Sequence, residues 1–71
     1  MRIEYNPKID LLYIRLDVRK QHVVNKRLAD DVVLDLGAED RIIGIEILDA
    51  SKHIDLKMLL PVEVDFSAPL A

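Results

Sequence analysis

The chain has no cysteine and no threonine among its 71 residues, and only two glycines and three prolines. The lack of cysteine excludes disulfide bridges, zinc sites with thiolate ligands and cysteine nucleophiles. The lack of threonine leaves Ser51 and Ser67 as the aliphatic hydroxyl groups, beside the phenols of Tyr5 and Tyr13. We therefore predict no catalytic residue from the sequence.

Aromatic residues are also scarce, at 4% of the chain. Proteins that bind single-stranded nucleic acids use aromatic side chains as stacking platforms, and nucleic-acid-binding domains are usually basic. This chain has a formal net charge of -3, and its glycines, Gly37 and Gly44, form no glycine-rich phosphate loop. A basic patch is expected across two neighbouring strands, formed by Arg15, Arg19, Lys20, Lys26 and Arg27. The acidic balance nevertheless predicts that nucleic acid is not a partner.

Long hydrophobic runs are absent too. No apolar stretch approaches the roughly 18 residues that a membrane-spanning helix needs. Arg2, Glu4, Lys8 and Asp10 interrupt the first ten residues, so no secretory signal is expected there. Together with the lack of cysteine, this pattern predicts a cytoplasmic protein without a membrane partner.

Aliphatic residues are abundant. Hydrophobic residues make up 51% of the chain, and 26 of the 71 residues are Leu, Ile or Val, which favours a packed, sheet-rich core. Charge is uneven, since residues 1–30 hold 7 Lys and Arg against 4 Asp and Glu, and residues 31–71 hold 3 against 9. This asymmetry favours attraction between the halves over an acidic face that meets a basic partner.

Alternation of apolar and polar residues is the main structural signal. It predicts five strands, at residues 2–5, 11–18, 23–28, 31–36 and 41–48. Short polar turns separate these strands, and strands joined in this way pair antiparallel.

The spacing of apolar residues changes after residue 48 from every second residue to that of a helix. Asp49 is a suitable N-cap, and Ala50, Ile54 and Met58 have the spacing of one helical face until Pro61 ends the helix. Beyond it, Val62, Val64 and Phe66 alternate with acidic residues and predict an extended arm that binds a partner by adding a strand to its edge.

The predicted fold is of the α+β class: an antiparallel β-meander of about five strands, a short C-terminal helix and the extended arm. Residues 1–60 form one small domain, and residues 61–71 form the arm. One short helix covers only part of a sheet face, and domains this small without disulfides or metals usually need a partner. We expect a homodimer or a complex with a small partner protein.

Three stretches follow one another in a characteristic order. Residues 5–16 read Tyr-Asn-Pro-Lys-Ile-Asp-Leu-Leu-Tyr-Ile-Arg-Leu, residues 31–35 read Asp-Val-Val-Leu-Asp, and residues 43–51 read Ile-Gly-Ile-Glu-Ile-Leu-Asp-Ala-Ser. Together they resemble the small prokaryotic family catalogued as domain of unknown function 2283, over residues 1–52. Asn6 stands where that family usually has Asp, and residues 37–40 replace its usual Asp-Gly turn. The resemblance implies an architecture without an established activity. Because such proteins often occur beside small toxin-like proteins, it also implies an antitoxin-like role.

Two carboxylates form the main candidate site. Asp35 and Glu46 lie on the outward registers of strands that pair across the turn at residues 37–41, so we expect them within about 5–8 Å of each other. Like charges at this separation need a cation, for which Arg15 or Arg41 is available. The pair is either a solvated face neutralised by arginine or an acid–base site.

Two functions therefore follow from the sequence. The first is a non-catalytic protein-interaction module, with an antitoxin-like role implied by the resemblance. The alternative is a small-ligand or metal-dependent enzyme that uses Asp35, Glu46 and His53. No cofactor and no metal site are predicted, because His22 and His53 lack carboxylates at ligand spacing.

Overall fold

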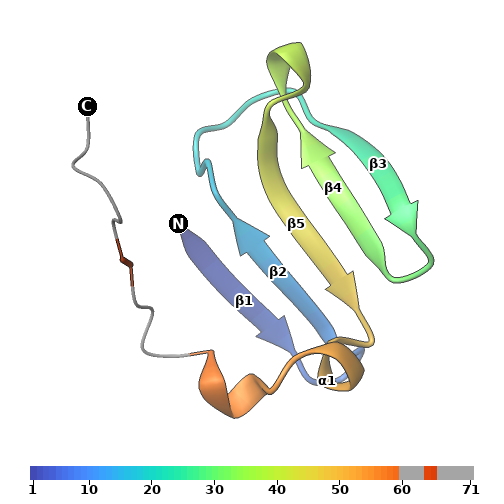
Figure 1. The fold of residues 1–71 in the computed structure, drawn as a ribbon. Coiled ribbons are helices and arrows are strands. Elements are labelled where there is room, and N and C mark those ends of the chain that lie inside the picture. The colour runs from blue at the N-terminus through green and yellow to red at the C-terminus, as the bar shows by residue number, and fades with distance from the viewer. Residues whose placement is uncertain (60–63, 66–71) are drawn as a thin grey trace.

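A five-stranded antiparallel sheet makes up most of the protein (Figure 1). The computed structural model describes residues 1–59 and 64–65. The strands are β1 (Arg2–Asn6), β2 (Leu11–Arg15), β3 (Val24–Ala29), β4 (Val32–Leu36) and β5 (Ile42–Leu48). The helical elements are short: η1 (Ala38–Asp40), α1 (Ala50–His53) and η2 (Leu56–Met58). The prediction of five antiparallel strands is confirmed.

The strands lie in the order β1-β2-β5-β4-β3. The predicted meander is therefore wrong at one connection, because β3 follows β2 in the chain but β2 pairs with β5. The most apolar strand, β5, takes the centre, where a neighbour on each side satisfies its backbone. All residues of β3 are exposed, and Lys26 and Arg27 are most easily accommodated at an edge.

The register divides the sheet into an aliphatic face and a polar face, since residues directly opposite each other in antiparallel strands point to the same side. The aliphatic face has two main rows, Ile3-Ile14-Ile45-Leu34 and Tyr5-Leu12-Ile47-Val32. The polar face has the rows Glu4-Tyr13-Glu46-Val33-Arg27 and Arg2-Arg15-Gly44-Asp35-Asn25.

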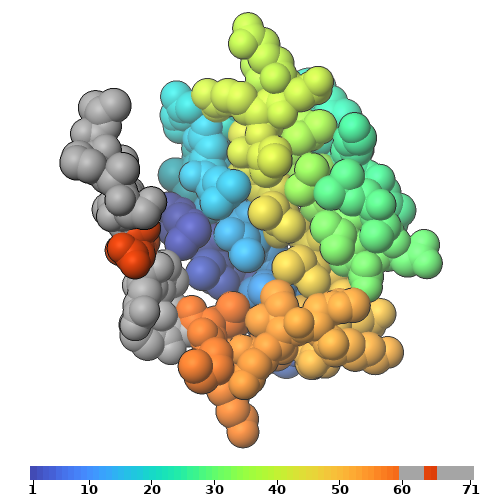
Figure 2. Space-filling view, in the orientation of Figure 1, coloured from blue at the N-terminus to red at the C-terminus, as the bar shows by residue number. Residues whose placement is uncertain are grey.

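The core is small. Among the described residues, the buried hydrophobic side chains are Leu12, Val33, Ile43 and Ala50. Figure 2 shows the orange segment of α1 and η2 gathered at one end of the sheet. Because α1 and η2 are short, they leave much of the aliphatic face uncovered.

Helix α1 follows β5 closely and is capped from a distant part of the chain. The Ser51 N–H donates to Asp10 Oδ1 at 3.0 Å, and the Ser51 hydroxyl donates to Asp10 Oδ2 at 2.6 Å. The predicted N-cap, Asp49, has a left-handed backbone (φ 51°) and makes no capping bond through its side chain. The turn between β1 and β2 therefore holds α1 against the end of the sheet.

The helix predicted up to Pro61 ends at His53 instead. The backbone of Ile54 is extended, with φ -132° and ψ 138°. The Asp55 side chain then accepts a hydrogen bond from the Lys57 N–H at 3.1 Å and begins η2. Aspartate often bonds nearby backbone in this way, and that competes with helix continuation. Met58, which was expected on an apolar helix face, is exposed.

The predicted arm lies mostly outside the described residues, which include Val64 and Asp65 but not Val62 or Phe66. Val64 and Asp65 are exposed and belong to no strand. Within residues 1–59 and 64–65, no helix has the length and apolar character that crossing a membrane requires.

Candidate functional site

A tyrosine on the polar face lies over a glycine. Tyr13 and Gly44 occupy neighbouring strands, and a Cβ atom on Gly44 would lie 2.8 Å from both Cε1 and the hydroxyl oxygen of Tyr13. The absence of a side chain at Gly44 lets the ring lie close to the sheet. The Tyr13 hydroxyl then donates a hydrogen bond to Asp35 Oδ2 at 2.7 Å.

An amide joins the two predicted carboxylates. Asn25 Nδ2 donates to Asp35 Oδ1 at 2.7 Å and to Glu46 Oε2 at 3.2 Å. The structure thus brings Asp35 and Glu46 together on the polar face, as expected. The group between them is Asn25, not the predicted arginine. Arg15 contacts the network only through the Tyr13 hydroxyl, to which its Nη1 donates at 3.3 Å.

Glu46 takes up a proton near neutral pH. Its hydrogen bond with Asp35 is the main cause that raises the pKa of Glu46 from its ordinary 4.5 to about 7, and partial burial adds to the effect. Asn25 and the positive charge of Arg27 act in the opposite direction. Burial and the bond to Asp35 also raise the pKa of Tyr13. At neutral pH the network therefore has a phenol that stays protonated and a Glu46 carboxyl close to half protonation.

This arrangement can accept or release one proton at neutral pH, the basic requirement of acid–base chemistry. Asp35 is only 5% exposed, so a ligand would meet the Tyr13 hydroxyl and Glu46 first. A hollow of about 380 Å³ opens beside Tyr13 on the same face, lined also by Arg2, Glu4, Arg15, Val18 and Lys20. Because β2, β3, β4 and β5 each contribute one residue to the network, it also holds four strands together.

His53 is not part of this network. It lies in α1, and its Nε2 is paired with Asp31 Oδ2 in the turn between β3 and β4. Among the described residues, no three His, Cys, Asp or Glu side chains lie close enough together to hold a metal ion. The predicted set is therefore divided into an Asp35–Glu46 pair and a separate His53–Asp31 pair.

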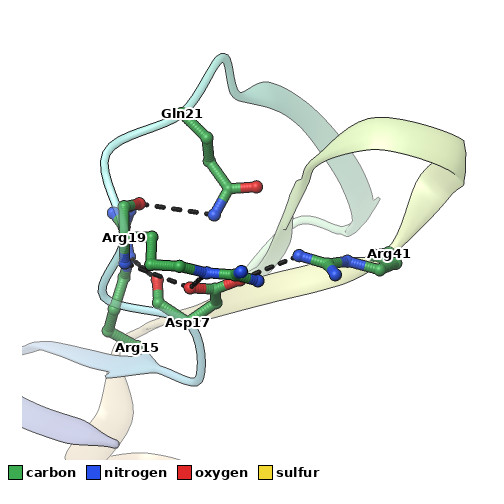
Figure 3. A network of polar contacts seen from close by, with 5 residues as sticks. All are labelled: Arg15, Asp17, Arg19, Gln21 and Arg41. Carbon is green, nitrogen blue, oxygen red and sulfur yellow. Dashed lines mark hydrogen bonds and ion pairs between the residues drawn. The ribbon is translucent and has the colours of Figure 1, made fainter.

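A second polar cluster forms where the chain leaves β2 (Figure 3). Asp17 accepts from Arg19 Nη2 at 2.7 Å and from Arg41 Nη2 at 2.8 Å, and Arg15 Nε donates to the Asp17 backbone oxygen at 2.5 Å. The bond from the Arg19 side chain is the main cause that holds the pKa of Asp17 well below its usual range. Arg41 therefore neutralises Asp17 and not the Asp35–Glu46 pair, which corrects the prediction.

The predicted basic patch does not form as one surface. Its members lie in two places because β5 and β4 separate β2 from β3. Lys26 and Arg27 are on the β3 edge, and the other three residues lie at the end of β2 or just after it.

Sequence reasoning missed Tyr13, Asn25 and Asp17 as members of these clusters. All three carry polar groups, and Tyr13 and Asn25 have the same outward register as Asp35. What the sequence did not provide was the strand order, which places β2 next to β5 and thus Tyr13 within reach of Asp35.

The chain belongs to the family described as "Protein of unknown function (DUF2283)", whose model matches residues 2–51. The resemblance inferred from the sequence is thereby confirmed. The match covers all five strands and includes both the Tyr13–Asp35 pair and the Asp10–Ser51 cap. No curated protein and no solved structure matches the chain.

Proposed function

We propose that this protein is a non-catalytic protein-interaction module that packs the aliphatic face of its sheet against a second polypeptide. One observation carries the proposal: Val24, Leu28 and Ile42 are 55%, 56% and 48% exposed. Val24 lies opposite Leu36 and extends the aliphatic face to the β3 edge, and Ile42 pairs with Leu36 from the other side, across the register shift between Asp35 and Leu36. Exposed apolar surface of this kind is typical of protein contacts, and a second chain would complete the small core.

The hydroxyl groups of the described residues support a non-catalytic role because they are engaged in structural bonds. The Ser51 and Tyr5 hydroxyls both donate to Asp10, and the Tyr13 hydroxyl donates to Asp35. The same carboxylates also accept from the Ser51 N–H at the start of α1 and from Asn25 Nδ2 of β3, so these bonds join elements of the fold.

The second polypeptide is a copy of this chain or a small partner protein. Family membership favours an antitoxin-like role, in which a small toxin-like protein would be the partner. We place the protein in the cytoplasm, since a chain without cysteine needs no oxidising environment.

Light scattering after size-exclusion chromatography tests the proposal. Ile42→Glu introduces a carboxylate into this exposed apolar cluster beside Leu36, so association should weaken by at least about tenfold, because burying an unpaired charge is costly. Val18→Glu is the matched control, since Val18 is 65% exposed and lines the hollow on the polar face. A monomeric wild-type chain that captures no partner from its native lysate, with or without residues 61–71, contradicts the proposal.

The alternative function is a small-ligand or metal-dependent enzyme. The raised pKa of Glu46, about 7, favours it, because a carboxyl that titrates near neutrality suits an acid–base role. This enzyme would use Asp35 and Glu46, with His53 joining only after it leaves Asp31. A thermal shift with a divalent cation or a metabolite, lost in Glu46→Gln, supports this function. No shift across such a panel counts against it.

A further inference from the structure

β3 (Val24–Ala29) is the exposed edge strand of the sheet. It pairs with β4, and no other described strand lies beside it. All its residues are exposed. The outer row of N–H and C=O groups on such a strand is a template for pairing with another strand. Because a bulge follows Arg27, the regular part of this template runs from Val24 to Arg27.

Two cations determine which strand can pair there. Lys26 lies on the aliphatic face opposite Leu34, and Arg27 lies on the polar face opposite Val33. A second β3 strand would bring four cations together along one seam, and like charges in neighbouring strands are destabilising. A strand with apolar side chains on one face and carboxylates on the other matches this edge better.

The chain itself contains a segment of this kind. Residues 62–66 read Val-Glu-Val-Asp-Phe, so apolar residues alternate with carboxylates. With its apolar residues beside Val24, this segment would place its carboxylates on the same face as Arg27. Val64 and Asp65, the described residues of the segment, are both exposed, Val64 at 69%. No described strand pairs with either of them.

Val64 and Asp65 lie on the side of their own sheet that is far from β3. Figures 1 and 2 show Val64–Asp65 beyond β1, with β3 at the opposite edge. Four inter-strand spacings, or about 19 Å, separate these edges. The chain leaves η2 on the β1 side (Figure 1), and the three residue-to-residue steps from Leu59 to Val62 span only about 10 Å when extended. A second copy must therefore supply the strand.

We propose that β3 of one copy receives residues 62–66 of a second copy as a sixth strand, and that two such exchanges form a dimer. This inference specifies the second polypeptide of the proposed function and rests on it. The β1 edge is the poorer acceptor, because Arg2 Nε and Glu4 Oε1 already form an ion pair at 2.7 Å and Ile3 is half-buried.

Charge exchange between the two segments tests the contact. Arg27→Glu should raise the dimer dissociation constant at least about tenfold, since it puts like charges on one seam. Asp65→Arg should raise it similarly, and the two substitutions together should restore most of the affinity. Arg2→Glu is the control at the other edge and should leave the dissociation constant unchanged. Sedimentation measures association, and circular dichroism checks that each variant is folded.

Cross-linking locates the contact independently. Because the chain has no native cysteine, any disulfide must join the introduced cysteines. A full-length Arg27→Cys chain mixed with an Asp65→Cys chain should form a mixed disulfide on mild oxidation. A Glu4→Cys chain mixed with the same Asp65→Cys chain should not. A disulfide within one chain that carries both Glu4→Cys and Asp65→Cys would overturn the proposal, because the segment would then pair with its own β1.

The outcomes separate this inference from the proposed function. If Ile42→Glu weakens the dimer but Arg27→Glu and Asp65→Arg do not, exchange of residues 62–66 is wrong and the interaction function stands. If the wild-type chain is monomeric but binds another protein through the aliphatic face, the exchange is again wrong. If it neither dimerises nor binds a partner, both proposals fail.

Discussion

Tyr13 lies across Gly44 and donates its phenolic hydrogen to Asp35, with 2.7 Å between the two oxygens. The relationship joins three strands, because Tyr13 is in β2, Gly44 in β5 and Asp35 in β4. It makes a glycine necessary in the middle of the central strand, where a residue with a side chain would otherwise stabilise the sheet. The Glu46 carboxyl belongs to the same network, through Asn25.

Gly44→Ala should destabilise the protein by about 1–3 kcal/mol, the usual cost of overpacking. The added methyl group would lie 2.8 Å from the Tyr13 ring and hydroxyl and would push the ring away. Chemical denaturation measures the loss. In a Tyr13→Ser background, which removes the ring, the same substitution should cost little, and an equal cost in both backgrounds would show that Tyr13 is not the cause.

Tyr13→Phe should cost about 1–3 kcal/mol, because it leaves a nearly buried carboxylate without one of its donors. Tyr5→Phe is the matched control. It removes a similar bond, from the Tyr5 hydroxyl to Asp10 at 2.7 Å, but Asp10 keeps both bonds from Ser51. The Tyr13 substitution should therefore lower the melting temperature more than the Tyr5 substitution, and the reverse order would contradict the assigned network.

The stability of the protein should fall as pH rises from about 4.5 to about 7. The pKa of Glu46 is raised to about 7 by its hydrogen bond with Asp35, so the folded chain keeps a proton that the unfolded chain releases near 4.5. The stabilisation that this bound proton gives is complete below pH 4.5, the ordinary pKa of Glu46, and is lost above a pH of about 7. Glu46→Gln mimics the protonated form. It should therefore reduce the dependence of the unfolding free energy on pH and raise the urea midpoint at pH 8.

Glu4→Gln is the control for this pH dependence, since Glu4 lies on the same face in an exposed ion pair with Arg2. This variant should show the same change of unfolding free energy between pH 5 and pH 8 as the wild type. A wild-type slope that Glu46→Gln does not change would mean that another group titrates in this range.

Asp10→Ala should cost about 1–2 kcal/mol, the range for loss of an N-cap. Asp10 holds the first turn of α1 through two bonds from Ser51. Asp40→Ala is the control, because both residues have positive φ, 53° and 58°, and share the backbone penalty for alanine. The difference between the two melting temperatures reports the side-chain bonds of Asp10, those from Ser51 and the one from Tyr5, and equal losses would show that Asp10 acts only through its backbone.

The sequence allowed more to be predicted about the local structure than about the site. The five strands were found because apolar side chains alternate along each of them, and Asp35 and Glu46 were placed on one face by the same alternation. The bridging group was assigned wrongly, because a cation was expected between two like charges and the amide of Asn25 joins them instead. The end of α1 was also missed, because the apolar spacing continues to Met58 while Asp55 starts a new turn.

The sequence by itself determined how many strands this protein has, which side chains share a face and how few catalytic groups are available. These properties depend on alternation and composition, which are local. Only the tertiary structure decided that β5 lies between β2 and β4, that Tyr13 reaches Asp35 over Gly44 and that Asp10 caps a helix 41 residues away. Strand order is decided by competition among all pairings for burial, and alternation within one strand carries no information about that competition.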